Sequence, residues 1–189
     1  MQNKEKNVRF EKVDQDTYTR LIVELSSMFN CEKIDLEAER LYALKNEYST
    51  YCYYEGDIDS LKQILNKIEG ALALHPYCVG TPVLMERLNG DLIPLIPLEK
   101  YLKKTCKNRI IINGKLAEKF TYGKIIEINV RSNRLNISYL RQSNSQKSLY
   151  MVYNEYELFL GYARIENVNK DRLKIIPVRD IGWYLRKGG

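Results

Sequence analysis

The residues with the clearest chemical potential are cations near the C-terminal end of the chain. Arg172 and Lys174 stand two positions apart in the run "RLKIIPV", whose apolar residues are typical of a strand. On a strand, residues two apart share one face at a separation of about 6 to 7 Å. This distance is similar to the spacing of successive phosphates along an extended nucleic-acid strand. The pair therefore predicts contact with a polyanion.

Other cations extend this candidate surface. Arg164 falls in an earlier strand-like run, Arg179 stands just before the final turn, and Lys124 follows the Tyr122-Gly123 pair. Arginine can hold a phosphate through two parallel hydrogen bonds or lie flat on a base. For Lys124 the alternative interpretation is that it is a solvated lysine at a helix end, with no contact to a polyanion. The predicted polyanion contacts are Arg164, Lys170, Arg172, Lys174, Arg179 and Lys124.

The closing segment "RDIGWYLRKGG" combines apolar, aromatic and charged residues. We expect Asp180 to cap a short helical turn, in which Ile181, Tyr184 and Leu185 have the spacing to close the core. Trp183 would then face the opposite way. An exposed tryptophan beside arginines is a candidate stacking platform or partner contact.

The sequence offers little for catalysis or metal binding. It contains one histidine, His75, and neither a GxxxxGKS/T phosphate loop nor a Gly-rich loop after a strand. The four cysteines stand more than twenty residues apart, without a CxxC pair, and His75 with Cys78 lacks a second pair of ligands. We therefore expect no catalytic residue, no cofactor and no metal. A reducing interior, without a disulfide framework, is the simpler interpretation of the cysteines.

Charge is divided unevenly along the chain. Residues 1–103 hold 13 Lys and Arg against 17 Asp and Glu, whereas residues 104–189 hold 17 against 7. This division predicts an N-terminal domain at 1–103 and a basic domain at 104–189 that meets a polyanion, unless the basic surface serves solubility alone. No apolar run reaches the roughly 18 residues needed to cross a bilayer, so a soluble chain is expected.

Hydrophobic spacing in the first domain predicts a mixture of helices and strands. Apolar residues recur every three or four positions in two segments and alternate in a third. The expected elements are a helix that begins after Asp14 or Asp16 and reaches Phe29, a hairpin that turns near residues 46–48, a helix over 57–70, short strands over 71–98 and a brief helix at 99–103.

The second domain is predicted to consist mostly of strands. "RIIING" predicts a short buried strand, and "KLAEKFTYGK" a short helix with Leu116, Ala117 and Phe120 inward and Gly123 at its end. Further strands are expected at residues 124–130, 135–140, 148–154, 158–166 and 172–178. The fold class is therefore α+β, with an antiparallel sheet and surrounding helices followed by a compact barrel-like β domain.

Four short segments resemble a known family. "HPYCVGTPVL" is similar to the Pro-Tyr-small-aliphatic-Gly-Thr segment of the Nip-seven family of ribosome biogenesis factors, and "NGKLAEKFTYGK" to its Phe-x-Tyr-Gly segment. "LFLGYARI" resembles its aliphatic-Gly strand, and "RDIGWYLR" its closing Asp-Ile-Gly-x-Tyr-Leu-Arg. Their order and spacing cover essentially the whole chain, and the last three resemble a PUA domain, a small RNA-binding pseudobarrel.

The resemblance implies an N-terminal domain that binds protein partners and a C-terminal PUA-type β pseudobarrel that binds RNA. It implies a non-enzymatic role in large-subunit pre-rRNA processing. The implied partners are pre-rRNA or other single-stranded, uridine-rich RNA, ribosome assembly factors and exosome subunits, with no membrane, and we expect a monomer. The Pro-Tyr form of the first segment and the lack of a concentrated Lys/Arg targeting cluster favour an archaeal, cytoplasmic member over a eukaryotic, nucleolar one.

The chain also departs from the family pattern. Trp183 stands where the family usually has a polar residue, so this surface is either covered or makes an added contact. The basic residues of the family's last loop and strand match through Arg172 and Arg179, whereas Lys170 and Lys174 are shifted.

Three other functions remain to be weighed. A protein adaptor without RNA contact would use the basic half to meet acidic proteins, and it would bind RNA no better than heparin. An enzyme acting on RNA is conceivable because PUA domains often accompany modifying enzymes, although the motifs above do not favour it. The "LRKGG" end superficially resembles a modifier protein that is conjugated through Gly-Gly, but such folds are about half this length.

Overall fold

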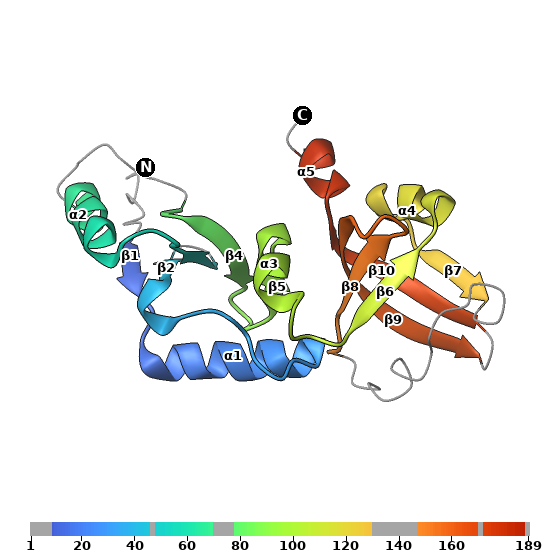
Figure 1. The fold of residues 1–189 in the computed structure, drawn as a ribbon, viewed down its shortest axis with the longest axis horizontal. Helices are drawn as coiled ribbons and strands as arrows, with labels where there is room; N and C mark the ends of the chain where they lie inside the picture. Colours follow the sequence, from blue (N-terminus) through green and yellow to red (C-terminus); the bar gives the residue numbers. More distant parts are fainter. Residues whose placement is uncertain (1–8, 46–47, 70–77, 130–146, 170–171, 188–189) are drawn as a thin grey trace, which may run out of the picture. The chain divides into compact units, whose positions relative to one another are not determined.

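The chain folds into two compact units. In the computed structural model, structure is described for residues 9–45, 48–69, 78–129, 147–169 and 172–187 (Figure 1). One unit consists of Met1–Arg20 with Asp35–Leu98, and the other of Leu21–Ile34 with Glu99–Gly189. This division differs from the expected boundary after Lys103, because a segment from the N-terminal half belongs to the C-terminal unit.

The N-terminal unit is built on an antiparallel sheet of five strands in the order β1-β2-β3-β4-β5. The strands are β1 (Arg9–Lys12), β2 (Leu41–Lys45), β3 (Ser49–Tyr53), β4 (Thr81–Glu86) and β5 (Leu92–Pro94). The predicted hairpin is confirmed, since β2 pairs with β3 from Leu41 opposite Tyr53 to Lys45 opposite Ser49. Short 3₁₀ turns at Ala38–Arg40 and Ile96–Leu98 connect the elements.

Two helices accompany this sheet, α1 (Gln15–Phe29) and α2 (Ile58–Glu69). Asp14 caps α1, because its carboxylate accepts a hydrogen bond from the Thr17 amide at 2.8 Å. This selects Asp14 from the two predicted caps. In α2, the side chain of Leu61 is fully buried and packs with Tyr42 and Val79.

The C-terminal unit contains a curled, half-barrel sheet in the order β6-β8-β9-β10-β7. Only the β6–β8 pair is parallel among the described strands; the other pairs are antiparallel. The predicted strand at 135–140 lies outside the described residues. The elements of the unit are α3 (Glu99–Leu102), β6 (Arg109–Ile112), α4 (Gly114–Thr121), β7 (Ile126–Asn129), β8 (Tyr150–Asn154), β9 (Phe159–Asn169), β10 (Arg172–Asp180) and α5 (Gly182–Lys187).

The sheet of the C-terminal unit is covered by different segments on its two faces. On one face α4 inserts Ala117 and Phe120 among buried aliphatic side chains, as predicted. On the other face the fully buried ring of Phe29 meets Tyr162 edge-on, with ring centroids 5.4 Å apart. The Asn108 side-chain amide also donates to the carbonyl oxygens of Met28 and Leu149. The end of α1 is therefore part of this unit's core.

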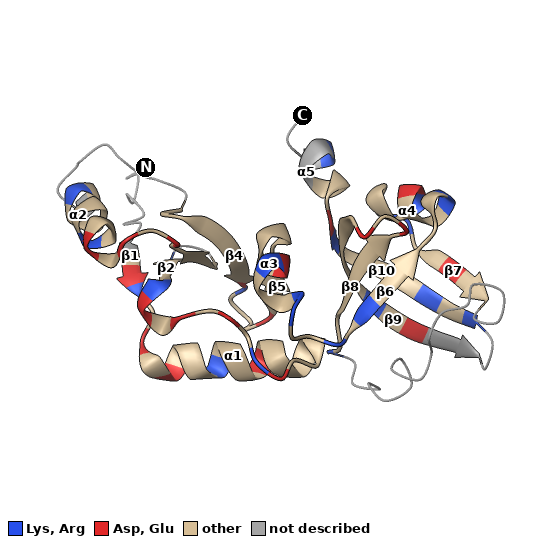
Figure 2. Ribbon diagram, in the orientation of Figure 1, with Lys and Arg blue, Asp and Glu red and all other residues tan. Residues whose placement is uncertain are grey.

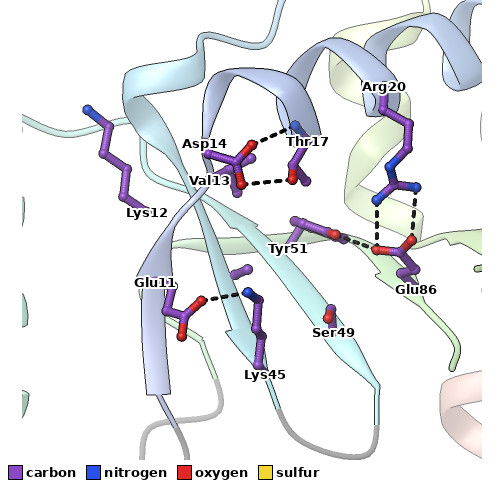
Figure 3. Close-up of a pocket in the computed structure, with 11 residues that line it drawn as sticks. Glu11, Lys12, Val13, Asp14, Thr17, Arg20, Lys45, Ser49, Tyr51 and Glu86 are labelled. Carbon is purple, nitrogen blue, oxygen red and sulfur yellow. Dashed lines mark hydrogen bonds and ion pairs between the residues drawn. The ribbon is translucent and has the colours of Figure 1, made fainter.

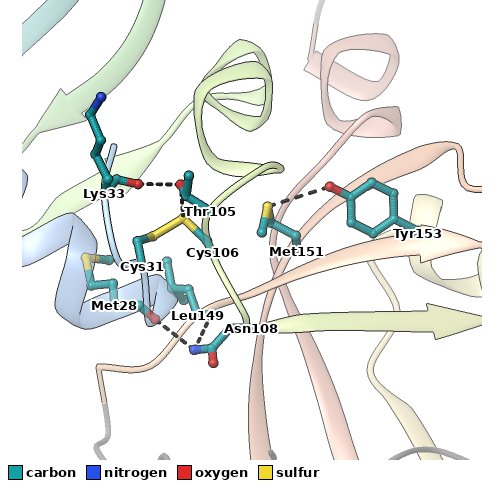
Figure 4. The surroundings of a disulfide bond; sticks show 9 residues. All are labelled: Met28, Cys31, Lys33, Thr105, Cys106, Asn108, Leu149, Met151 and Tyr153. Carbon is teal, nitrogen blue, oxygen red and sulfur yellow. Dashed lines mark hydrogen bonds between the residues drawn. A yellow bond between two sulfur atoms is a disulfide. The ribbon is translucent and has the colours of Figure 1, made fainter. Parts of the chain in front are cut away.

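The cysteines correct the sequence-based expectation of a chain without a disulfide framework. Cys31 is bonded to Cys106 and Cys52 to Cys78 (Figure 4). Cys31 and Cys106 face each other in an antiparallel bridge, and the hydroxyl of Thr105 donates to the carbonyl of Lys33 beside them. The partners lie 75 and 26 residues apart in the chain, so their spacing gave no sign of pairing.

The disulfide at Cys78 also removes the weak metal candidate, since its sulfur is already bonded to Cys52. His75 lies outside the described residues. Within the part of the chain that is described, no helix is long and apolar enough to cross a membrane.

The replacement Phe29→Ala should destabilise the C-terminal unit by about 3 to 5 kcal/mol, because a fully buried aromatic ring is lost. Hydrogen exchange should accelerate in β8 and β9, while β2 and β3 stay protected. The control Leu61→Ala, in the core of the N-terminal unit, should give the reverse pattern. Faster exchange in β2 and β3 for Phe29→Ala would assign residues 21–34 to the N-terminal unit instead.

Candidate nucleic-acid interface

Three glycines from separate sequence motifs meet where α4, β9, β10 and α5 come together. Gly123 follows α4 with a φ of +71°, and Gly161 interrupts β9 with a φ of +146°, both in the region that favours glycine. Gly182 begins α5. Gly161 and Gly182 allow approaches to backbone atoms that a Cβ atom would block, and Gly123 leaves room for the end of the Arg186 side chain.

Gly161 lets β9 lie directly against the end of β10. A Cβ atom at this position would collide with the carbonyl oxygen of Arg179 and stand 2.7 Å from the Cα of Asp180. The register of the two strands shifts between Pro177 and Arg179. The shift lies near the end of β10 that leads into α5, and the glycine of "LFLGYARI" permits the close approach of the two strands there.

Gly123 and Gly182 bring the end of α4 close to α5. Lys124 donates its amide proton to the Lys119 carbonyl at 3.1 Å, which closes α4 in the manner of a Schellman cap with Gly123 at the left-handed position. A Cβ atom on Gly182 would collide with the carbonyl oxygen of Thr121. The "TYG" and "DIG" segments are thus parts of one contact.

Arg186 stabilises the contact between the end of α4 and α5 through two hydrogen bonds. One terminal nitrogen donates to the carbonyl oxygen of Thr121, and the other donates to Oδ2 of Asp180 at 2.8 Å. The Asp180 side chain is 5 % exposed and that of Arg186 is 36 % exposed. Two elements that are far apart in sequence are therefore held by a single guanidinium group.

Two expectations for the tail are wrong. Asp180 does not cap α5, because it ends β10 and its Oδ2 atom binds Arg186, while its buried Oδ1 atom has no hydrogen-bond partner within the described residues. Ile181 does not close the core, because it is 41 % exposed. The side chains of Tyr184 and Leu185 lie outside the described residues.

Arg179 and Trp183 are in contact with each other. The guanidinium carbon of Arg179 lies 3.9 Å from the centroid of the Trp183 ring, and Arg179 is only 8 % exposed. The expected open cation on the strand surface is therefore a buried one, and Trp183 is a partly buried ring that already stacks on an arginine.

The turn after α4 and the segment from Ile181 into α5 carry a set of partly apolar, partly basic side chains, which we call the corner surface. It consists of the exposed side chains of Tyr122, Lys124, Ile125, Ile181 and Arg186. Tyr122 is 61 % exposed, with the Lys124 ammonium 5.9 Å from its ring centroid. Sequence reasoning found Lys124 but missed Tyr122 and Ile125 as surface groups, since aromatic and aliphatic residues next to a helix are usually core.

The other predicted cations lie on the face of β9 and β10 that is opposite α4. Lys174 stands between Glu127 of β7 and Glu166 of β9 in the strand register, and its ammonium is 3.4 Å from the Glu127 carboxylate. Across the three neighbouring strands the charges alternate in sign, from Glu166 to Lys174 to Glu127, and Figure 2 shows basic and acidic residues side by side on this sheet. The pair of cations inferred from β10 alone is therefore partly neutralised by its neighbours.

The two arginines of this face, unlike Lys174, are not placed opposite acidic residues. Arg164 is opposite Ile176 and Arg172 is opposite Asn129, and both arginines are exposed. Within the described part of the chain, neither side chain makes an ion pair. Lys170 lies outside the described residues.

The N-terminal unit contains a polar pocket of about 240 Å³ (Figure 3). Arg20 forms two contacts with Glu86, at 2.8 and 3.1 Å, and the Tyr51 hydroxyl donates to the same carboxylate at 2.5 Å. Burial and this hydrogen bond raise the pKa of Tyr51 well above its usual value. Lys45 is paired with Glu11 at 2.6 Å. These charges are satisfied by one another, so the pocket does not favour a particular ligand.

The glycine contact can be tested through stability. Gly161→Ala should lower the free energy of unfolding of the C-terminal unit by more than about 3 kcal/mol, because the added Cβ meets backbone atoms that cannot rotate away. Gly90 is the matched control, since it has a φ of +83° but open space around it. Gly90→Ala should cost its own unit about 1 to 2 kcal/mol. Thermal melting measures both, and equal losses would contradict the close contact of β9 and β10.

Comparison with known proteins adds one finding. Residues 108–189 match the family model described as the UPF0113 PUA domain, which covers less than half of the chain. A comparison with curated proteins found no match. The PUA part of the resemblance seen in the sequence is confirmed, whereas membership in the Nip-seven family stays a prediction. The C-terminal unit thus contains a PUA domain, and domains of this kind generally bind RNA.

Proposed function

We propose that this protein binds single-stranded RNA through its C-terminal unit and that it does so without catalysing a reaction. The observation that carries the proposal is the PUA match over residues 108–189, because domains of this kind generally bind RNA. The corner surface and the exposed arginines of β9 and β10 supply groups suited to such a ligand.

Two kinds of contact would hold the RNA. Lys124, Arg164 and Arg172 are exposed cations that can neutralise phosphates, and they would make the affinity fall steeply with salt. The exposed ring of Tyr122 offers a face on which an unpaired base can stack.

The ligand would be single-stranded because an exposed aromatic ring can contact only bases that are free of a duplex. In an A-form helix the bases are stacked and paired, and the deep major groove excludes side chains. Phosphate contacts carry no sequence information, so the preference among single-stranded sequences should be weak. Uridine-rich RNA is the ligand that the family resemblance favours.

We further propose a role in the maturation of large-subunit pre-rRNA, from the four segments that resemble the Nip-seven family. In this role the N-terminal unit would bind ribosome assembly factors or exosome subunits. The protein would act in the cytoplasm of an archaeal cell, or in the nucleolus of a eukaryotic one.

A protein adaptor that makes no specific RNA contact is the second candidate. The alternating charges around Lys174, Glu127 and Glu166 favour it, because a mixed-sign strand face suits a folded protein partner better than a polyanion.

RNA binding can be tested with an oligouridylate and with heparin at the same salt concentration. The proposal expects tighter binding to the RNA, because stacking on Tyr122 adds to the phosphate contacts.

Arg172→Glu with Lys174→Glu should weaken RNA binding and reduce the salt slope by about 0.7 for each lost phosphate contact. Glu127→Gln, which removes an acid beside Lys174, should strengthen binding.

Equal affinity for heparin and RNA would support the adaptor instead. If the charge reversal leaves RNA binding unchanged, the strand face takes no part in it.

For the cellular role, crosslinking in cells followed by sequencing should enrich large-subunit pre-rRNA, and a lack of enrichment would refute that role.

A further inference from the structure

We propose that Arg186 is a positioning residue, which holds α5 against the turn after α4 and thereby fixes the corner surface for RNA. The inference rests on the proposed RNA binding, because the surface it positions is the one assigned to RNA. It assigns Arg186 a role distinct from direct phosphate contact, although the residue is basic and belongs to the basic half of the chain.

The geometry of the guanidinium group carries this inference. Its two terminal nitrogens donate to acceptors on different elements, the Thr121 carbonyl at the end of α4 and the Asp180 carboxylate at the end of β10. A planar fork can serve two such acceptors at once, whereas a lysine ammonium is a point charge on a flexible stem.

The glycines on both sides show that the contact is closely fitted. A Cβ atom on Gly123 would lie 3.0 Å from one terminal nitrogen of Arg186, and a Cβ atom on Gly182 would lie 2.8 Å from the other. The guanidinium group therefore lies between the turn after α4 and the first residue of α5, in space that the two glycines leave open.

Arg186 is poorly placed to leave Asp180 for a phosphate. The Asp180 side chain is almost completely buried, and its Oδ1 atom already has no hydrogen-bond partner within the described residues. Removing Arg186 would leave a buried carboxylate without its ion-pair partner, which is strongly unfavourable. We therefore expect the pair to persist when RNA binds, while Lys124 makes the phosphate contact.

Loss of the Arg186 hydrogen bonds would disturb the two parts of the corner surface, which are the turn after α4 and the segment that leads into α5. Tyr122 and Lys124 lie in and beside the turn that Arg186 holds, and Ile181 precedes the first residue of α5. Trp183 lies on α5 itself, stacked on Arg179. RNA that contacts the turn and α5 together would lose affinity when these elements separate.

The decisive variant is Asp180→Ala. A positioning role of Asp180 through Arg186 and a purely electrostatic role of its negative charge predict opposite changes in RNA affinity. Removing an acid from a polyanion-binding unit should strengthen RNA binding if only charge matters. If Asp180 acts through Arg186, oligouridylate binding should instead weaken by about five- to tenfold. Tighter binding by Asp180→Ala would overturn the proposal.

Arg186→Met and Lys124→Met form a matched pair, since each removes one positive charge. Both should weaken oligouridylate binding, but only Lys124→Met should reduce the salt slope, by about 0.7. A similar reduction for Arg186→Met would show that Arg186 contacts phosphate directly, which would contradict a positioning role.

Trp183 gives a readout that does not depend on RNA, because it is the only tryptophan of the chain. Its emission should shift to the red, and acrylamide should quench it faster, in Asp180→Ala and Arg186→Met. Unchanged emission in both variants would overturn the proposal.

The readouts also separate this proposal from the proposed function. If the wild type does not bind oligouridylate, RNA binding fails regardless of what Trp183 reports. If Asp180→Ala and Arg186→Met do not fold, Arg186→Lys decides, because it keeps the charge and loses the planar fork. Wild-type affinity in Arg186→Lys would then refute the positioning role.

Discussion

The ion pair between the buried Asp180 carboxylate and the partly exposed Arg186 is the interaction on which the C-terminal unit's candidate RNA surface depends. It joins the end of β10 to α5, and the second nitrogen of Arg186 binds the last carbonyl of α4. A buried carboxylate needs such a partner, and Gly123 and Gly182 leave open the space in which the guanidinium group lies. The exposed groups of the corner surface lie on the turn after α4 and on the segment that leads into α5, which Arg186 holds together.

The same unit depends on a segment that lies far away in the chain. Phe29 and Met28, at the end of α1, complete the sheet face that α4 does not cover. The bond between Cys31 and Cys106 holds this segment beside the connection between α3 and β6. The matched PUA region begins only at residue 108, so the structural unit is larger than the family match.

Local features of the fold could be predicted from the sequence. The four-residue spacing of Leu21, Leu25 and Phe29 identified α1, and the alternation around Tyr51 and Tyr53 identified a hairpin strand. Such patterns depend on neighbours along the chain, where geometry is fixed by the helix or the strand.

Features that depend on distant neighbours could not be predicted in this way. The cysteine pairs and the glutamates on both sides of Lys174 arise from the tertiary fold and from the register between strands. The contact of Arg179 with Trp183 joins residues only four positions apart, but it depends on how the turn between β10 and α5 directs the chain. The tail was also assigned wrongly: Ile181 has the spacing of a core residue, but it lies in the turn between β10 and α5 and is exposed.

The central claim, that the corner surface of the PUA domain contacts single-stranded RNA, is tested most directly by photo-crosslinking. The protein would be irradiated with an oligouridylate, and the crosslinked peptides would be identified by mass spectrometry. The structure predicts that crosslinks concentrate at Tyr122, in the turn that follows α4, and on α5. Crosslinks confined to the N-terminal unit, or crosslinks that heparin removes as readily as unlabelled RNA does, would contradict the claim.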